Sequence, residues 1–292
     1  MSATLHFRGE VDAASPGSAG RRARLMHPVH RWRMRASNSS SLGLGSLAAR
    51  ALRDLARLVL PVECAGCGVV DLLLCTDCRA LLDQSPARCE EGAPRWDRMV
   101  GPVPPIWTLA RYAGPVREIV VAWKDRGRAD LSRPLEAAVR RGTARIAAEL
   151  VELGPVVVVP VPSSALARRR RGADLVRDLA RCVALSAREC GVDARSCAAL
   201  RQVRRVRDQV GLSSRARSRN LAGGVRVRRT WLRGAPLPTA SRVLLVDDVV
   251  TTGATLAACA RALEAAGSIV VGAVVVAATP PPGDRSTRGS RC

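Results

Sequence analysis

The sequence predicts an α/β fold, with a parallel sheet flanked by helices and a small N-terminal module that holds four cysteines. Two short runs of branched aliphatic residues, 156–159 and 243–246, are typical of parallel strands buried on both faces. Helical patterns separate these runs, which favours right-handed crossover connections. Two Cys-x-x-Cys pairs lie upstream of the strands and indicate the smaller module.

Composition and patterning divide the chain into four predicted segments. Their bounds are 1–45, 46–105, 106–279 and 280–292. The first is rich in Ser, Gly and Arg without periodicity; we expect it to be disordered, or a non-native extension upstream of the true start, because Met26 and Met34 offer later starts. The second should begin with a helix over 47–59, capped by Ser46. The last is expected to be a flexible tail.

The third segment carries the α/β pattern, which begins at about Ile106. We expect a helical stretch that ends at Trp123 and Lys124, and a strand over 268–278 after the last helix. The other expected helices cover 133–153, 173–190 and 256–263, and the other expected strands cover 156–159 and 243–246.

Composition excludes several classes of protein. Hydrophobic residues make up 47% of the 292 residues, enough for a core, while aromatic residues make up only 2%. No apolar run approaches the roughly 20 residues of a membrane span, and the N-terminus does not resemble a secretory signal, so we expect a cytoplasmic protein without membrane contact. The three histidines are His6, His27 and His30, which leaves the rest of the chain without a Cys–His or Ser–His catalytic pair.

The formal net charge of +22 raises the question of nucleic acid binding. Lys124 is the only lysine, so 46 of the 47 basic residues are Arg, a bias that genome composition also explains. One Tyr and one Phe offer few surfaces for stacking single-stranded bases. The charge would equally steer a small polyanion, and DNA or RNA contact stays open as an additional role.

Four cysteines in the second segment have the spacing of a metal site. Cys64 and Cys67 form one pair, and Cys75 and Cys78 form another after a gap of seven residues. Four thiolates suit tetrahedral zinc, and a reducing compartment disfavours two disulfides. We expect structural zinc, with redox chemistry or metal-free knuckles as the alternatives. All four positions would be filled by cysteine, so this metal would not activate water.

The segment 243–255, called the signature segment below, holds the main functional prediction. We expect Asp247 and Asp248 at the end of the strand, followed by a turn rich in hydroxyl groups and a helix. Helix N-termini attract phosphate, and paired carboxylates can accept hydrogen bonds from a ribose diol while a divalent cation offsets their charge. These features together predict phosphoribosyl pyrophosphate with magnesium. The predicted binding residues are Asp247, Asp248, Val249, Thr251, Thr252, Gly253, Ala254 and Thr255.

The signature segment resembles that of type I phosphoribosyltransferases. The resemblance implies that Asp247 and Asp248 hold the ribose 2′ and 3′ hydroxyls, and that the loop from Thr251 to Thr255 surrounds the 5′-phosphate. It also implies that the loop after the 156–159 strand is a pyrophosphate loop, formed by Val161, Pro162, Ser163 and Ser164 with Arg168 and Arg171. The alternatives are a buried strand with a polar helix cap, and a solvated basic helix start.

The basic connection 201–220 is interpreted as a flap that closes over the substrate and excludes water, with a solvated hairpin as the alternative. Together with the cysteine pairs, Lys124–Arg128, the pyrophosphate loop and the signature segment, it resembles the ComF family, whose members are competence-associated and amidophosphoribosyltransferase-like. That family reads Phe-Asn-Gln where this chain has Ala173-Asp174-Leu175, which puts the usual contacts in doubt.

The resemblance implies transfer of ribose 5-phosphate to an acceptor with release of pyrophosphate. No residue stands out as a general base, and the acceptor and the oligomeric state are not predicted. The alternative is a ligand-sensing or adaptor protein without turnover, which would have DNA or competence-machinery proteins as partners in uptake and recombination.

Overall fold

A computed structural model describes residues 62–96, 102–164, 168–169, 172–203, 224–228, 238 and 240–281. All of them belong to one compact unit of the chain, Ala51–Cys292. The predicted N-terminal extension, the helix over 47–59, most of the flap and residues 282–292 of the tail lie outside the described residues, and the segment bounds remain predictions.

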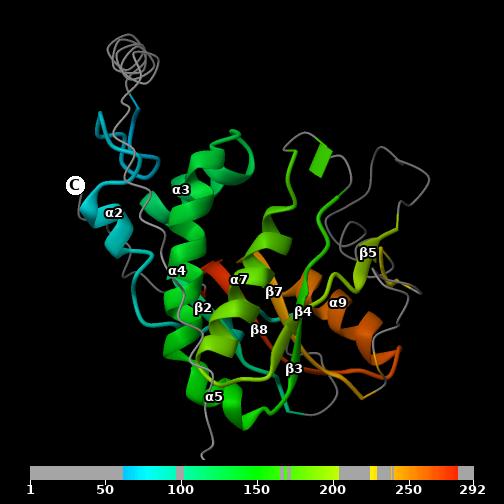
Figure 1. Cartoon of the computed structure of the whole chain (residues 1–292). Coiled ribbons are helices and arrows are strands. Elements are labelled where there is room, and N and C mark those ends of the chain that lie inside the picture. The colour runs from blue at the N-terminus through cyan, green and yellow to red at the C-terminus, as the bar shows by residue number, and fades with distance from the viewer. Residues whose placement is uncertain are drawn as a thin grey trace, which may run out of the picture. The chain divides into compact units, whose positions relative to one another are not determined.

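A six-stranded sheet forms the centre of this unit, and its order is β1-β2-β8-β7-β3-β4 (Figure 1). Every neighbouring pair is parallel except β1 and β2. A separate antiparallel pair is formed by β5 and β6. The strands are β1 Ala87–Arg88, β2 Ile106–Arg111, β3 Val156–Pro160, β4 Ala194–Ser196, β5 Leu200–Gln202, β6 Val225–Val227, β7 Arg242–Val250 and β8 Ile269–Ala278. The α/β fold with a mostly parallel sheet is therefore confirmed.

Helices cover both faces of the sheet. The described helices are α2 Thr76–Ala80, α3 Gly114–Lys124, α4 Ser132–Arg145, α5 Ala147–Glu152, α7 Leu175–Glu189 and α9 Ala254–Glu264, with 3-10 turns at Glu90–Gly92 and Ala129–Leu131. Among the residues that the structure describes, no helix has the length and apolar character to cross a membrane.

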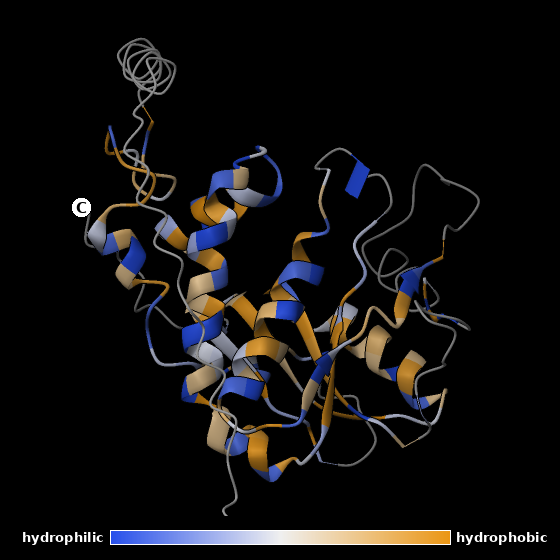
Figure 2. Cartoon of the chain, in the orientation of Figure 1, coloured by the Kyte–Doolittle hydropathy of each residue, from blue (hydrophilic) through white to orange (hydrophobic). Residues whose placement is uncertain are grey.

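Alternate residues of β7 enter two separate hydrophobic cores, which explains why this strand shows no alternation in hydropathy. Leu244 and Val246 pack in the core that includes α3, α4 and α7. Val243 and Leu245 pack in the core that includes α9. Figure 2 shows the central strands as hydrophobic. A strand covered on both faces needs apolar side chains at every position.

Two predicted boundaries were wrong. The helix expected over 133–153 is broken at Ile146, whose backbone has φ −100° and ψ 9°. Ile146 is buried in the core together with Val139 and Leu150, so the apolar face continues across the break. The strand expected to end before the acids continues to Val250, because Val249 and Val250 pair with Ala277 and Ala278 of β8.

Candidate functional site

Asp247 and Asp248 lie inside β7 near its carboxyl end, and both are buried. Their exposed fractions are 9% and 4%. Each carboxylate accepts a hydrogen bond from the next backbone N–H: Asp248 N donates to Asp247 Oδ1 at 2.8 Å, and Val249 N donates to Asp248 Oδ1 at 2.8 Å. These bonds fix the orientation of both side chains.

The loop between β7 and α9 presents hydroxyl groups beside an uncapped helix start. Thr251 and Thr252 are exposed, and Ala254 and Thr255 are half-buried. Gly253 occupies the N-cap position with φ 71°, and no side chain caps the helix. The first N–H groups of a helix lack internal partners and lie at the positive end of its dipole. The arrangement can therefore bind a phosphate group.

A cleft of about 500 Å³ lies at the carboxyl ends of β3 and β4. We call it the arginine cleft. Its lining residues are Pro160, Val161, Pro162, Arg168, Asp174, Arg177, Ser196, Cys197, Ala198, Leu200 and Arg228. Three guanidinium groups against a single carboxylate indicate a site that favours an anion.

The sheet brings the arginine cleft next to the acids. Pro160 of β3 pairs with Val246 of β7, and Val161 N donates to Val246 O at 2.8 Å. The loop that lines the cleft therefore starts beside Asp247. Ligands of open parallel sheets bind beyond the carboxyl ends of neighbouring strands.

The predicted pyrophosphate loop is only partly in the cleft. Val161, Pro162 and Arg168 line it, while Ser163 and Ser164 do not. Arg168 instead donates from its guanidinium to Ser163 O, and its backbone N donates to Ser164 O at 3.0 Å. Arg171 lies outside the described residues.

A family model for the phosphoribosyl transferase domain matches residues 132–288, more than half of the chain. The chain belongs to the phosphoribosyl transferase domain family. No protein among those with curated functions matches it. The matched residues include the predicted pyrophosphate loop, the arginine cleft and the signature segment. The cysteine pairs and α3 precede the match.

Lys124 is a site residue that the sequence prediction missed. It lies at the end of α3, before the matched phosphoribosyl transferase residues, and its Nζ is 2.7 Å from Asp248 Oδ2. The signal was present in the sequence, because Lys124 is the only lysine and belongs to a segment that resembles the ComF family. The two acids are therefore compensated by a protein cation as well as by backbone N–H groups.

The pKa shifts of this cluster follow from burial and charge. Burial, together with the charge of Asp248, raises the pKa of Asp247 well above its ordinary value, although Lys124 opposes the shift. Burial would lower the pKa of Lys124, but the negative charge of Asp248 and the hydrogen bond to it raise the pKa instead. The protonated, charged form of Lys124 is therefore favoured, whereas the ionised form of Asp247 is energetically unfavourable in its buried position.

Gly253 has a structural reason to be glycine in addition to the predicted approach of a phosphate. A Cβ at this position would lie 2.9 Å from Trp96 Cβ and 3.0 Å from Trp96 N. Arg95 N donates to Thr252 O at 3.0 Å, which fastens the signature loop to the segment around Trp96. Trp96 is fully buried and donates from Nε1 to Pro104 O at 2.7 Å.

Arg177 and Arg228 are two more cleft residues that the sequence prediction missed. Arg177 lies in the first turns of α7, and Arg228 follows β6 at the base of the predicted flap. Arg228 Nε donates to Leu200 O at 3.2 Å. In a chain with this many arginines, no local pattern marks these two, and only the fold brings them to one cleft.

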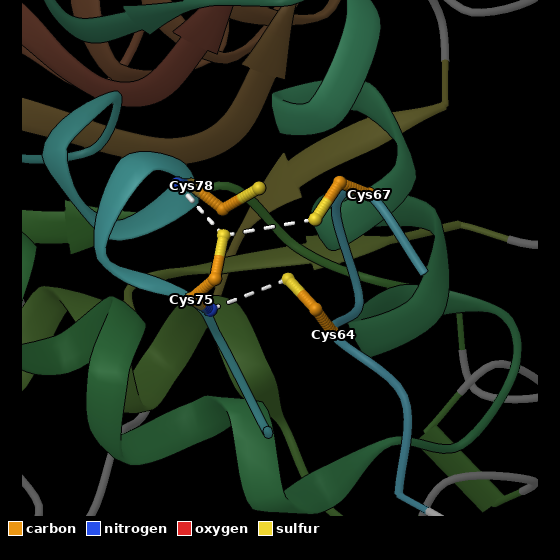
Figure 3. Close-up of side chains that lie close together, drawn as sticks. All are labelled: Cys64, Cys67, Cys75 and Cys78. Carbon is orange, nitrogen blue, oxygen red and sulfur yellow. Dashed lines mark hydrogen bonds between the residues drawn. The ribbon is translucent and has the colours of Figure 1, made fainter. Parts of the chain in front are cut away.

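The four predicted cysteine ligands converge (Figure 3). The sulfur atoms of Cys64, Cys67, Cys75 and Cys78 lie within 4.8 Å of one another. Cys67 Sγ and Cys75 Sγ are 3.6 Å apart, close to the roughly 3.8 Å that tetrahedral bonds of about 2.3 Å to zinc require. Cys75 is also the N-cap of α2. The cluster fits a metal such as zinc, which would hold the knuckle together.

Within the cluster, the thiol of Cys64 ionises more readily than an ordinary cysteine thiol. Burial alone would raise the pKa of Cys64, but backbone N–H groups led by that of Cys75 lower it to about 6. Cys75 N donates to Cys64 Sγ at 3.3 Å. Zinc binds the thiolate form, so this donor assists metal binding.

Proposed function

We propose that the protein binds phosphoribosyl pyrophosphate with magnesium and transfers ribose 5-phosphate to an acceptor, with release of pyrophosphate. The proposal rests on one observation: three features of the site lie near the same edge of the sheet. They are the buried acids of β7, the uncapped start of α9 and the arginine cleft. A diol, a terminal phosphate and a pyrophosphate are the chemical groups that these three features suit.

In this proposal, each part of the site has one role. Asp247 and Asp248 accept hydrogen bonds from the ribose hydroxyls. Thr251, Thr252 and the first N–H groups of α9 bind the 5′-phosphate. Arg168 neutralises charge on the pyrophosphate as it leaves, and Arg171 is a candidate for the same role. Magnesium, when bound with the ligand, would supply further positive charge to the pyrophosphate.

The transition state of such a transfer carries positive charge at the anomeric carbon. Fixed carboxylates that are already oriented by backbone N–H groups require little reorganisation when that charge develops. Catalysis would come from positioning and electrostatics, and the proposal assigns no general base.

The second candidate is a ligand-sensing or adaptor protein of the ComF type, located in the cytoplasm, which takes part in DNA uptake or recombination. Two observations favour it. Asp174, one of the residues that depart from the ComF pattern, lines the arginine cleft, and its Oδ2 lies 4.0 Å from Arg168 Nε. A carboxylate there competes with pyrophosphate for the cation. The net charge of +22 would also favour contact with DNA.

Pyrophosphate release separates the two candidates. The protein is incubated with phosphoribosyl pyrophosphate, magnesium and a panel of nucleobases and amines, beside an Asp248→Asn control. Release that depends on magnesium and on one acceptor, and that the control lacks, supports the transferase. Ligand binding without release, with DNA retention that falls as salt rises, supports the adaptor instead.

A further inference from the structure

Lys124 connects the acidic pair to a part of the chain that the phosphoribosyl transferase match does not include. Its Nζ lies 2.7 Å from Asp248 Oδ2, and the side chain of Asp248 is only 6% exposed. We propose that Lys124 is a positioning residue for ligand binding, whose ammonium group keeps Asp247 and Asp248 in the charge state and orientation that a phosphate-bearing ligand requires. This inference rests on the proposed function.

The charges at the site explain why such a cation is needed. Asp247 and Asp248 are adjacent and buried, and the proposed ligand carries several negative charges of its own. Buried carboxylates without compensation take up protons, and a protonated acid is a poorer acceptor for a sugar hydroxyl. Magnesium bound with the ligand cannot compensate the acids before the ligand arrives. Lys124 is already in place.

The helix that carries Lys124 is held at its N-terminal end by the cysteine knuckle. A Cβ on Gly66 of the knuckle would lie 3.1 Å from Pro115 Cβ and 2.7 Å from Cys78 Sγ, so the knuckle backbone packs directly on the first turn of α3. A larger residue at Gly66 would have to displace Cys78 Sγ, so glycine suits this close approach.

The other end of α3 is held as well. Arg128 Nη1 donates to Glu63 O at 3.2 Å, and Trp123, which is 2% exposed, donates from Nε1 to Ser132 Oγ at 3.0 Å. Lys124 therefore extends from a backbone that is fixed on both sides. Its contact with Asp248 differs from that of a surface lysine on a free helix end, where an ion pair contributes little.

Few other ionisable groups face Asp247. On β7 its neighbour is Asp248, and across the sheet it pairs with Val275 of β8, which is apolar. From α9 the thiol of Cys259 faces it, with a pKa that burial and the charge of Asp247 raise. Asp125 is another charge close to Lys124. Lys124 is therefore a cation that acts directly on this pair.

The test compares Lys124→Met, Lys124→Gln and Lys124→Arg with a matched control, Arg126→Met. Arg126 lies two residues away and pairs with Glu118 at 2.9 Å on the surface. Zinc content and circular dichroism show which variants are folded. Two properties are then measured from pH 5 to about 9: the titration of the aspartate carboxyl carbons by NMR without ligand, and the affinity for phosphoribosyl pyrophosphate with magnesium.

We expect Lys124→Met and Lys124→Gln to move the Asp247 titration to higher pH and to weaken binding at pH 7 by about 10-fold or more. The affinity should rise again with pH, following the shifted titration. Lys124→Arg keeps the charge and should keep the wild-type titration and most of the affinity. Arg126→Met should match the wild type in both properties.

An unshifted titration in Lys124→Met would overturn the inference, and so would weak binding by Lys124→Arg despite a wild-type titration. A role of Lys124 in packing alone would lower stability without moving the titration. If the wild type binds no phosphoribosyl pyrophosphate at any pH, the proposed function fails. The titration without ligand then decides whether Lys124 sets the charge of the acids.

Discussion

Asp247 and Asp248 differ in their surroundings although they are adjacent in β7. Asp248 has a lysine partner at 2.7 Å. Asp247 is held by a backbone N–H, and burial raises its pKa well above the ordinary value. The ionised form of Asp247 is therefore less favourable in the folded protein than in the unfolded chain, and this cost lowers the stability of the fold. Binding residues that cost stability are expected where the ligand completes the site.

Asp247→Asn should raise the free energy of unfolding at neutral pH. The pKa of Asp247 is higher in the folded than in the unfolded state, so wild-type stability falls as pH rises from the unfolded to the folded pKa, by about 1.4 kcal/mol per unit of difference. The variant lacks this decline, and Asn can still accept the bond from Asp248 N. Urea unfolding of the wild type and of Asp247→Asn from pH 4 to about 8 measures how the free energy of unfolding changes with pH.

Asp83→Asn is the control, because the pKa of Asp83 is shifted in the opposite direction to that of Asp247. Hydrogen bonding to Arg141 lowers the pKa of Asp83, so its contribution to stability is present at neutral pH and is lost as pH falls. Parallel pH curves for wild type and Asp247→Asn would contradict the assignment of a raised pKa to Asp247.

Gly253→Ala should destabilise the protein by about 1–3 kcal/mol or more, because it adds a clash to backbone strain. Gly253 has φ +71°, and its Cβ would lie 2.9 Å from Trp96 Cβ. Gly191→Ala is the matched control, since Gly191 has φ +88° with nothing within 4 Å of the added Cβ. Thermal unfolding compares the two variants. If both variants lost the same amount of thermal stability, the clash with Trp96 would make no contribution at Gly253.

Among the elements, the cysteine knuckle supports α3, and α3 supports the acidic pair. The knuckle packs on α3 through Gly66 and Pro115, and α3 ends at Lys124. A structural metal in the knuckle would therefore stabilise a contact at the proposed ligand site without taking part in the chemistry.

Cys78→Ser should abolish the binding of one zinc ion per chain and should lower the melting temperature. The reason is that four sulfur ligands within 4.8 Å of one another depend on the metal for compensation. Metal analysis, with hydrogen exchange at residues 64–80 and in α3, measures the effect. Cys190→Ser, at an exposed cysteine outside the cluster, is the control. Full zinc content in Cys78→Ser would rule out the four-cysteine site.

The elements that carry strong local signals were predictable. Four consecutive valines gave the position of β3, and the two Cys-x-x-Cys pairs gave the cysteine cluster. The packing of Trp96 on Gly253 and the pairing of Lys124 with Asp248 were not predicted, since both join segments far apart in the chain. The burial of the acids was missed for the same reason, because it depends on what covers the end of β7.

In the molecule as a whole, sheet order determines which loops meet. β7 lies between β3 and β8, so the loop after β3 and the loop after β7 emerge side by side. These two loops are far apart in the chain. The resemblance to type I phosphoribosyltransferases implied that both belong to one site, and the rules for parallel sheets explain why they meet. The arginine cleft could be found only from the structure, because its residues come from the ends of β3 and β4, from α7 and from the segment after β6.

A calorimetric titration of the full chain with phosphoribosyl pyrophosphate and magnesium tests the central claim most directly. The account predicts saturable binding at one site per chain in the wild type, weakened at least about 10-fold in Asp248→Asn, since a hydrogen bond to a charged group contributes about 1.5–3 kcal/mol. Absence of binding by the wild type, or equal affinity in Asp248→Asn, would contradict it.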